Sequence, residues 1–385
     1  MQSRYLFVTV EGMARTIGTA LAGRDNSLNA VRLGLAAAVI LAHSWTIGGY
    51  GDSALRWIGA NSVNGFFALS GFLIAGSRLR HEFWPYLTRR AQRIFPGFWV
   101  CLIVIGFVFA PLGALISGHG WHPFESLSYI RDNASLVIVT RDIGDSLAAS
   151  PEGSNWNRSF WSLMHEFIAY LVCGALLGIA WVRRHLALAA AIVVILLPIA
   201  AVSVGDLDGP AHMINDGLRL LSFYFAGVLA YALRERIHTS HLVAIACAVG
   251  VITAGFTSQT LLYALTPLPL TYLLLHIGGT WRTSIAAQED VSFGLYIYGY
   301  PVQQILAMLG LGTIAPVSVF ALVSLACTYP LAVASWRLVE KPAMLATLLT
   351  TPEVVDPALD PTTERALRAE HERDQRAATA LLGAR

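Results

Sequence analysis

Apolar runs of about twenty residues alternate with short polar loops along most of the chain. A helix needs about 20 mostly apolar residues to cross a bilayer, and continuous runs of this length favour helices over strands. The pattern therefore predicts an all-α, polytopic membrane bundle of about ten transmembrane helices. The ten runs lie near residues 28–47, 62–79, 94–117, 159–181, 186–204, 213–233, 241–258, 260–277, 292–312 and 314–335.

Composition supports a membrane protein. Of the 385 residues, 55% are hydrophobic and only 13% are charged, whereas soluble domains carry about 25% charged residues. The net charge of +2 is too small to suggest an acidic partner, so we expect contact with lipids and none with nucleic acid. The four cysteines form no CxxC or Cys/His cluster, so we expect them to be small core residues and we expect no metal site.

Arginines indicate how the helices are oriented. They gather in the loops after the second, fourth, sixth and eighth runs, and short Arg-rich loops face the cytoplasm. With ten spans, both termini are then cytoplasmic. We expect a cytoplasmic N-terminal segment (1–27) that lacks signal-peptide order, a membrane domain (28–345) and a charged cytoplasmic tail (346–385).

The first apolar run, VRLGLAAAVILAHSW, carries Arg32 and His43. Eleven residues at about 100° each come within roughly 20° of three full turns, so the two side chains share a stripe about 16 Å long. Arg32 then lies toward the cytoplasm and His43 toward the outside. Ionisable residues within spans usually face the bundle interior and mark a site, although both side chains could instead reach toward the two interfaces.

Glu166, in SFWSLMHEFIAYL, lies about two turns from the outer end of the fourth run. It could approach His43 at a similar depth, and a neighbouring carboxylate can orient an imidazole and raise its basicity. The alternative is a local pair with an arginine such as Arg158.

The second and ninth runs contain further polar and small residues. In FFALSGFLIAGSRLR, Gly71 and its neighbouring glycines favour close helix contacts, and Ser70 is either a packing residue or a nucleophile. In SFGLYIYGYPVQQ a proline interrupts the helix, and Tyr298 and Gln304 are candidates for substrate contact or packing. At least one of the two glutamines should face inward, since a glutamine facing lipid is costly.

A cluster of arginines follows the second run, in YLTRRAQRIFPGFW. Arg89 and Arg93 share a helix face at spacing i, i+4, with Arg90 adjacent. Guanidinium groups suit phosphate binding. The alternative is a positively charged cytoplasmic anchor without a ligand.

Together and in order, five stretches resemble the family 3 membrane acyltransferases, which O-acylate carbohydrates and other exported acceptors. They are NAVRLGLAAAVILAHSW, FFALSGFLIAGSRLR with the following YLTRRAQRIFPGFW, SFWSLMHEFIAYL, SFGLYIYGYPV and SWRLVEKP. The resemblance covers residues 29 to 342. Two departures stand out: WSLMHE keeps one acidic residue where the family often has two, and Gly299 and Tyr300 occupy the place of a frequent histidine.

The resemblance implies transfer of an acyl group, acetyl by expectation, from cytoplasmic acyl-CoA to a hydroxyl of a carbohydrate or a lipid-linked acceptor. Acyl-CoA is then a co-substrate, and no tightly bound cofactor is expected. It places His43 in the reaction centre as general base with Glu166 beside it, and Arg32, Arg89, Arg90 and Arg93 as donor-binding residues in a multi-pass protein of the inner membrane.

Two other classes use similar residues. A secondary transporter also has buried Arg, His and Glu side chains and a broken helix, but it usually shows internal repeats, and this sequence has none at a fixed period. A non-catalytic membrane scaffold gives no reason for Arg32, His43 and Glu166 to lie within spans.

Overall fold

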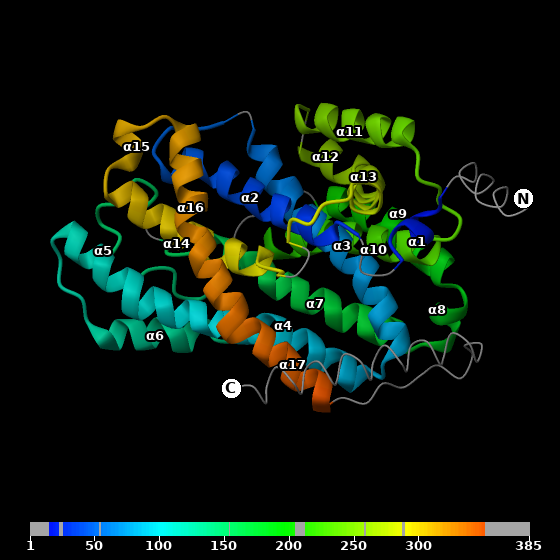
Figure 1. Cartoon of the computed structure of the whole chain (residues 1–385), viewed down its shortest axis with the longest axis horizontal. Helices are drawn as coiled ribbons and strands as arrows, with labels where there is room; N and C mark the ends of the chain where they lie inside the picture. The colour runs from blue at the N-terminus through cyan, green and yellow to red at the C-terminus, as the bar shows by residue number, and fades with distance from the viewer. Residues whose placement is uncertain are drawn as a thin grey trace, which may run out of the picture.

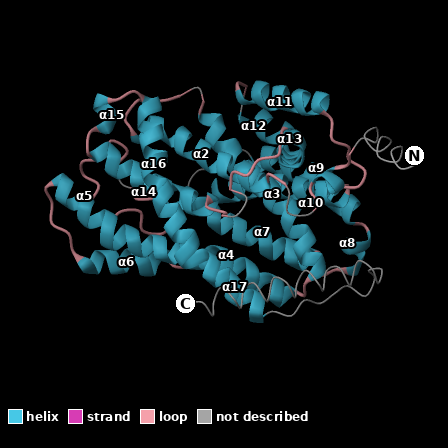
Figure 2. Cartoon of the chain, viewed as in Figure 1, coloured by secondary structure: helices cyan, strands magenta, loops and turns pink. Residues whose placement is uncertain are grey.

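The chain is helical wherever its computed structural model describes it. The described residues are 15–22, 26–53, 55–153, 155–204, 212–257, 259–286 and 289–350. Figure 2 shows only helices and loops over these ranges, whose one β-type pairing is an isolated bridge between Thr16 and His238. The predicted all-α class is thus confirmed. Most of the predicted cytoplasmic tail, residues 351–385, lies outside the described residues.

The α-helices follow one another closely along the chain (Figure 1). They are α1 (Ile17–Ala20), α2 (Leu28–Ile47), α3 (Arg56–Arg80), α4 (Phe83–Val104), α5 (Ala110–Ser117), α6 (Pro123–Asn133), α7 (Trp161–Leu176), α8 (Ala180–Arg184), α9 (Leu186–Val204), α10 (His212–Ala232), α11 (His241–Gly255), α12 (Gln259–Leu265), α13 (Pro267–Thr280), α14 (Ser292–Met308), α15 (Leu311–Ile314), α16 (Val317–Ser335) and α17 (Lys341–Thr350). Two π-helical turns, Ile105–Phe109 and Trp336–Glu340, and one 3₁₀ turn, Arg158–Phe160, continue some of them.

Several helices have the length and composition of membrane spans. Among the described residues, five helical stretches are long and apolar enough to cross a bilayer: Leu28–Ile47, Trp57–Arg80, Phe83–Ser117, Arg158–Leu176 and Val317–Ala346. All ten predicted spans fall on helical segments, some of them shorter or broken. The protein is an integral membrane protein, while the count of ten crossings and the cytoplasmic termini stay predictions.

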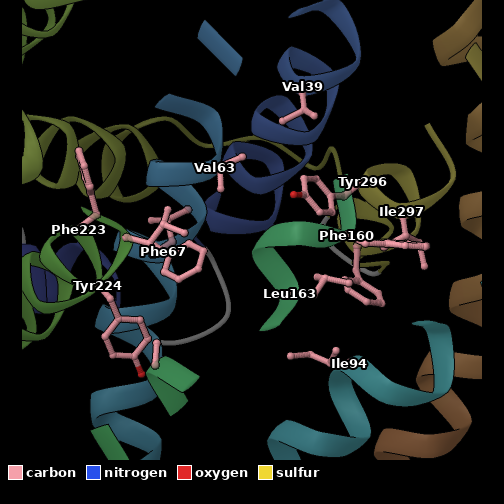
Figure 3. Packing of buried hydrophobic residues seen from close by; sticks show 14 of the residues in the cluster. Val39, Val63, Phe67, Ile94, Phe160, Leu163, Phe223, Tyr224, Tyr296 and Ile297 are labelled. Atoms are coloured by element: carbon pink, nitrogen blue, oxygen red, sulfur yellow. The ribbon is translucent and has the colours of Figure 1, made fainter. Parts of the chain in front are cut away.

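Helix α3 lies at the centre of the bundle and packs against α2, α7, α10 and α13, whereas α14 packs between α2 and α16 (Figure 1). Side chains from these helices and from α4 form one continuous buried cluster. Figure 3 shows part of it, including Phe67 of α3 with Phe223 and Tyr224 of α10. Five of the packed helices, α2, α3, α4, α7 and α14, carry the residues that line the cavity described below.

Glycines allow α3 and α10 to cross closely. A Cβ on Gly71 would lie 1.8 Å from the carbonyl oxygen of Tyr224, and one on Gly227 would lie 2.0 Å from that of Ala68. No side chain fits at either position, because backbone atoms fill the space. The predicted close contact at the glycines of the second span is confirmed. The cysteines are less uniform than expected: Cys101 and Cys173 are buried, but Cys327 is exposed.

Candidate active site

A cavity opens between α2, α3, α4, α7 and α14. Counting the open space at its mouth, it encloses about 750 Å³. Apolar residues of α3 and α4 form much of its wall. Its polar lining comprises Arg32, Ser70, Arg90, Arg93, Ser162, Glu166, Tyr170, Ser292 and Tyr296.

Glu166 is the carboxylate of this cavity. Ser70 of α3 donates a hydrogen bond to its Oε1 at 3.3 Å, and the Tyr170 hydroxyl, one turn along α7, donates to the same oxygen. The structure thus brings Ser70 and Glu166, two sequence candidates, into direct contact.

A second polar pair lies where α7 meets α14. The hydroxyls of Ser162 and Tyr296 are 2.7 Å apart, and Tyr296 donates to the carbonyl of Ser159 at 2.8 Å. Both side chains line the cavity. Sequence reasoning did not select either of them, since a serine or tyrosine in an apolar run has no distinctive spacing.

Two of the predicted donor-binding arginines have carboxylate partners. Asp290, just before α14, pairs with Arg32 and, at 2.6 Å, with Arg93. Arg93 also reaches Glu340 at 3.5 Å, and Ser335 donates to the other Glu340 oxygen at 2.8 Å. These five residues tie the start of α2 and α14 to α4 and to the π-helical turn after α16.

The charge of Asp290 is stabilised by its partners. Burial opposes ionisation, but Arg32 and Arg93 outweigh it and lower the pKa of Asp290 to about 2. Asp290 therefore stays ionised at neutral pH and keeps both guanidinium groups paired. The sequence analysis missed Asp290 and Glu340. The available signal was an acidic residue two positions before the motif SFGLYIYGYPV and another inside the motif SWRLVEKP.

Arg90 differs from Arg93. It lines the cavity, and its Nε is buried without a hydrogen-bond partner among the described residues. The ion pairs of the described part of the chain do not include it. Arg89 precedes it on α4 and is half-buried. The three arginines of the sequence cluster thus divide, with Arg93 bound to carboxylates and Arg90 facing the cavity.

His43 lies apart from this cavity and from Glu166. Its ring meets the ring of Tyr300 edge to face, with centroids 5.1 Å apart, and it is not among the residues that line the cavity. The expected pairing of His43 with Glu166 is not formed, because Glu166 is bound to Ser70 and Tyr170. The alternative partner of Glu166 is also wrong: Arg158 pairs with Glu152 at 2.5 Å.

The C-terminal half of α14 is deeply buried. Both Gln303 and Gln304 have no exposed surface, so the inward orientation expected for at least one of them is confirmed. Gln304 donates to the carbonyl of Asn155 at 2.9 Å, and Tyr298 is 3% exposed. Trp156 is fully buried and donates to Ser146, so it is a core residue.

Among the described residues, no group of three or more His, Cys, Asp or Glu side chains is arranged to hold a metal ion.

Comparisons with known proteins cover most of the chain. The family model described as "Acyltransferase domain" (Acyl_transf_3) matches residues 25–337. An O-acetyl transferase of Shigella phage Sf6 is 25% identical over 338 residues, covering 83% of this chain and 96% of the relative. Nodulation protein 10 of Rhizobium leguminosarum bv. viciae is 27% identical over 363 residues, covering 84% and 94%.

No solved structure matches the chain significantly. The family match covers far more than half of the chain and includes every residue that lines the cavity. The chain therefore belongs to the Acyl_transf_3 family of acyltransferases and is a membrane O-acyltransferase.

Proposed function

We propose that this enzyme transfers an acyl group, acetyl in the first instance, from cytoplasmic acyl-CoA to a hydroxyl of a carbohydrate or a lipid-linked acceptor at the inner membrane. One observation carries the proposal: a single cavity combines Arg90, which has no ion pair among the described residues, with the Ser70–Glu166–Tyr170 network. The printed name of the phage relative supports acetyl transfer to oxygen.

The donor site is assigned to the cavity. Acyl-CoA carries phosphates, and a guanidinium fork binds phosphate oxygens through two parallel hydrogen bonds. Arg90 is the principal phosphate ligand, with Arg89 beside it. Arg32 and Arg93 shape the wall, because Asp290 already pairs with both of them.

In this proposal His43 acts on the acyl end of the donor, near the opposite end of α2 from Arg32. Eleven residues separate it from Arg32, about 16 Å along a helix, a gap that the extended pantetheine arm of acyl-CoA spans. His43 takes the proton of the acceptor hydroxyl as its oxygen attacks the thioester carbonyl. The carbon–sulfur bond then breaks, and the thiolate of CoA receives the proton from the imidazolium.

Glu166 serves the donor side in this scheme. Its carboxylate and the hydroxyls of Ser70 and Tyr170 offer hydrogen bonds to the polar arm of the donor. A covalent route, in which Glu166 takes the Ser70 proton and Ser70 carries the acyl group as an ester, uses the same 3.3 Å contact. Because the chain belongs to an acyltransferase family, the alternative of a secondary transporter is dropped.

The test is acyl transfer in membranes that contain equal amounts of wild type, His43→Ala or Glu166→Gln. Labelled acetyl-CoA is supplied and label is followed in lipid and polysaccharide fractions. We expect label with wild type and its loss with His43→Ala. Undiminished label with His43→Ala would exclude His43 as the base, and absence of label with wild type across a range of acyl-CoA donors would exclude the donor class.

A further inference from the structure

His43 needs a neighbour that holds its imidazole, and Glu166 does not provide one. We propose that Tyr300 is the positioning residue of His43, and that it is itself fixed by Glu152 from the loop between α6 and α7. The inference rests on the proposed role of His43 as base. It adds a residue to which neither the family match nor the named relatives assign a role.

The first observation is the ring contact. The planes of His43 and Tyr300 meet at 73°, with centroids 5.1 Å apart, which is the edge-to-face geometry that aromatic rings prefer. Tyr300 is 1% exposed, so its ring cannot swing away without repacking. His43 itself is half-buried.

The second observation is that the Tyr300 hydroxyl has a charged partner. It donates to Oε1 of Glu152 at 3.4 Å, and Arg158 binds the same oxygen at 2.5 Å. Only 11% of the Glu152 side chain is exposed, against 61% of Arg158. The carboxylate thus links a buried phenol to a guanidinium at the surface, and charge-assisted bonds of this kind are the stronger ones.

The third observation is that the same face of α14 holds the surrounding loop. Gln304 lies four residues after Tyr300 and therefore on the same helix face. It accepts a hydrogen bond from Ser150 and donates to the carbonyl of Asn155 at 2.9 Å. The loop before α7 is thus bound to α14 at two places: Glu152 bonds Tyr300, and Ser150 and Asn155 bond Gln304.

The neighbouring face of α14 holds α2 around His43. Gln303 donates to the carbonyl of Ile40 and to the hydroxyl of Ser44, each at 2.9 Å. A Cβ on Gly299 would lie 2.7 Å from Ile40, so the two helices touch directly here. Residues before and after His43 on α2 are therefore held against α14, and Tyr300 contacts the His43 ring itself.

A tyrosine that only fills space and a tyrosine that orients His43 lead to different expected kinetics for Tyr300→Phe. If the tyrosine only fills space, Tyr300→Phe lowers stability and leaves the kinetics of the folded enzyme unchanged. If it orients His43 through Glu152, loss of the hydroxyl lowers kcat while the donor KM stays the same, because the donor cavity is built from other residues.

The experiment compares Tyr300→Phe and Glu152→Gln with wild type in purified, detergent-solubilised full-length enzyme, using acetyl-CoA and whichever acceptor fraction takes up label in the membrane transfer experiment. Tyr50→Phe is the matched control, because the Tyr50 hydroxyl also donates a hydrogen bond, to Ala315 at 2.6 Å, and its ring also packs edge to face, on Phe320. Thermal stability is recorded for each variant.

We expect kcat to fall about tenfold in both test variants, a part of the roughly 10²–10⁴-fold that a general base contributes. Donor KM should stay within about twofold, as should every parameter of the control. Full kcat in Tyr300→Phe or in Glu152→Gln would overturn the inference even when His43→Ala is inactive. An active His43→Ala enzyme would instead overturn the proposed function, so the two failures are distinguishable.

Discussion

The hydroxyl of Ser70 lies 3.3 Å from Oε1 of Glu166, across the contact between α3 and α7. This contact places the carboxylate of the WSLMHE motif in the cavity between α2, α3, α4, α7 and α14, whereas His43 has a different set of neighbours. The polar groups of the enzyme are thus divided between two places: one around Glu166 and Arg90, the other around His43 and Tyr300.

Replacing Ser70 distinguishes a positioning hydroxyl from a nucleophile. If Ser70 only bonds Glu166, Ser70→Ala removes one hydrogen bond with a net worth of about 0.5–1.5 kcal/mol, which corresponds to a roughly 2- to 12-fold rise in donor KM. Donor KM and kcat are measured, with Ser324→Ala as control because its hydroxyl bonds only within its own helix. Complete loss of transfer, together with an acetylated Ser70 peptide in wild type, would instead establish the covalent route.

Arg90 and Arg93 should respond differently to substitution. Arg90→Lys keeps the charge but loses the guanidinium fork, so we expect weaker acetyl-CoA binding, by about tenfold, and little change in stability. Binding is measured by calorimetry on solubilised protein. Arg184→Lys, at an exposed position on α8, is the control. Unchanged binding in Arg90→Lys would argue against its role as phosphate ligand.

Arg93→Met should mainly affect folding. It leaves Asp290 and Glu340 without their shared guanidinium partner, and removal of one member of a buried ion pair costs about 3–5 kcal/mol. We expect a lower melting temperature in detergent and less protein in the membrane. A melting temperature equal to that of wild type would show that the pairs contribute little.

The Asp290 ion pairs predict a stability change at low pH. The pKa of Asp290 is lowered from 3.8 to about 2, so ionised Asp290 stabilises the folded state fully above pH 4. As pH falls from about 4 to 2 this contribution, about 2 kcal/mol, is lost. The melting temperature of wild type minus that of Asp290→Asn should be constant above pH 4 and shrink below it. A difference independent of pH down to 2 would contradict the assignment.

The crossing of α3 and α10 predicts a strong effect from one methyl group. Gly71→Ala forces the added carbon against the Tyr224 carbonyl, 1.8 Å away, and overpacking typically costs about 1–3 kcal/mol. Gly34→Ala is the control, because nothing lies within 4 Å of its Cβ position. Melting temperatures of the two variants should differ clearly, and equal values would disprove the close crossing.

The sequence by itself determined the features that depend on local order. Runs of apolar residues specify helices in a membrane, because every backbone polar group there must be satisfied within the helix. Small residues in the second span predict a close crossing, and the order of five motifs points to the acyltransferase family. Helical periodicity also places Arg32 and His43 on α2 without any tertiary contact.

Only the tertiary structure decided which side chains meet. Spacing along a helix fixes the direction of a side chain relative to its own axis, but the rotation, tilt and depth of each helix depend on packing against its neighbours. For that reason the sequence predicted Glu166 at a depth similar to that of His43, whereas in the structure Glu166 bonds Ser70. For the same reason Asp290 and Glu340 met Arg93, and Tyr300 met His43, across gaps of about 200 to 260 residues in sequence that no periodicity spans.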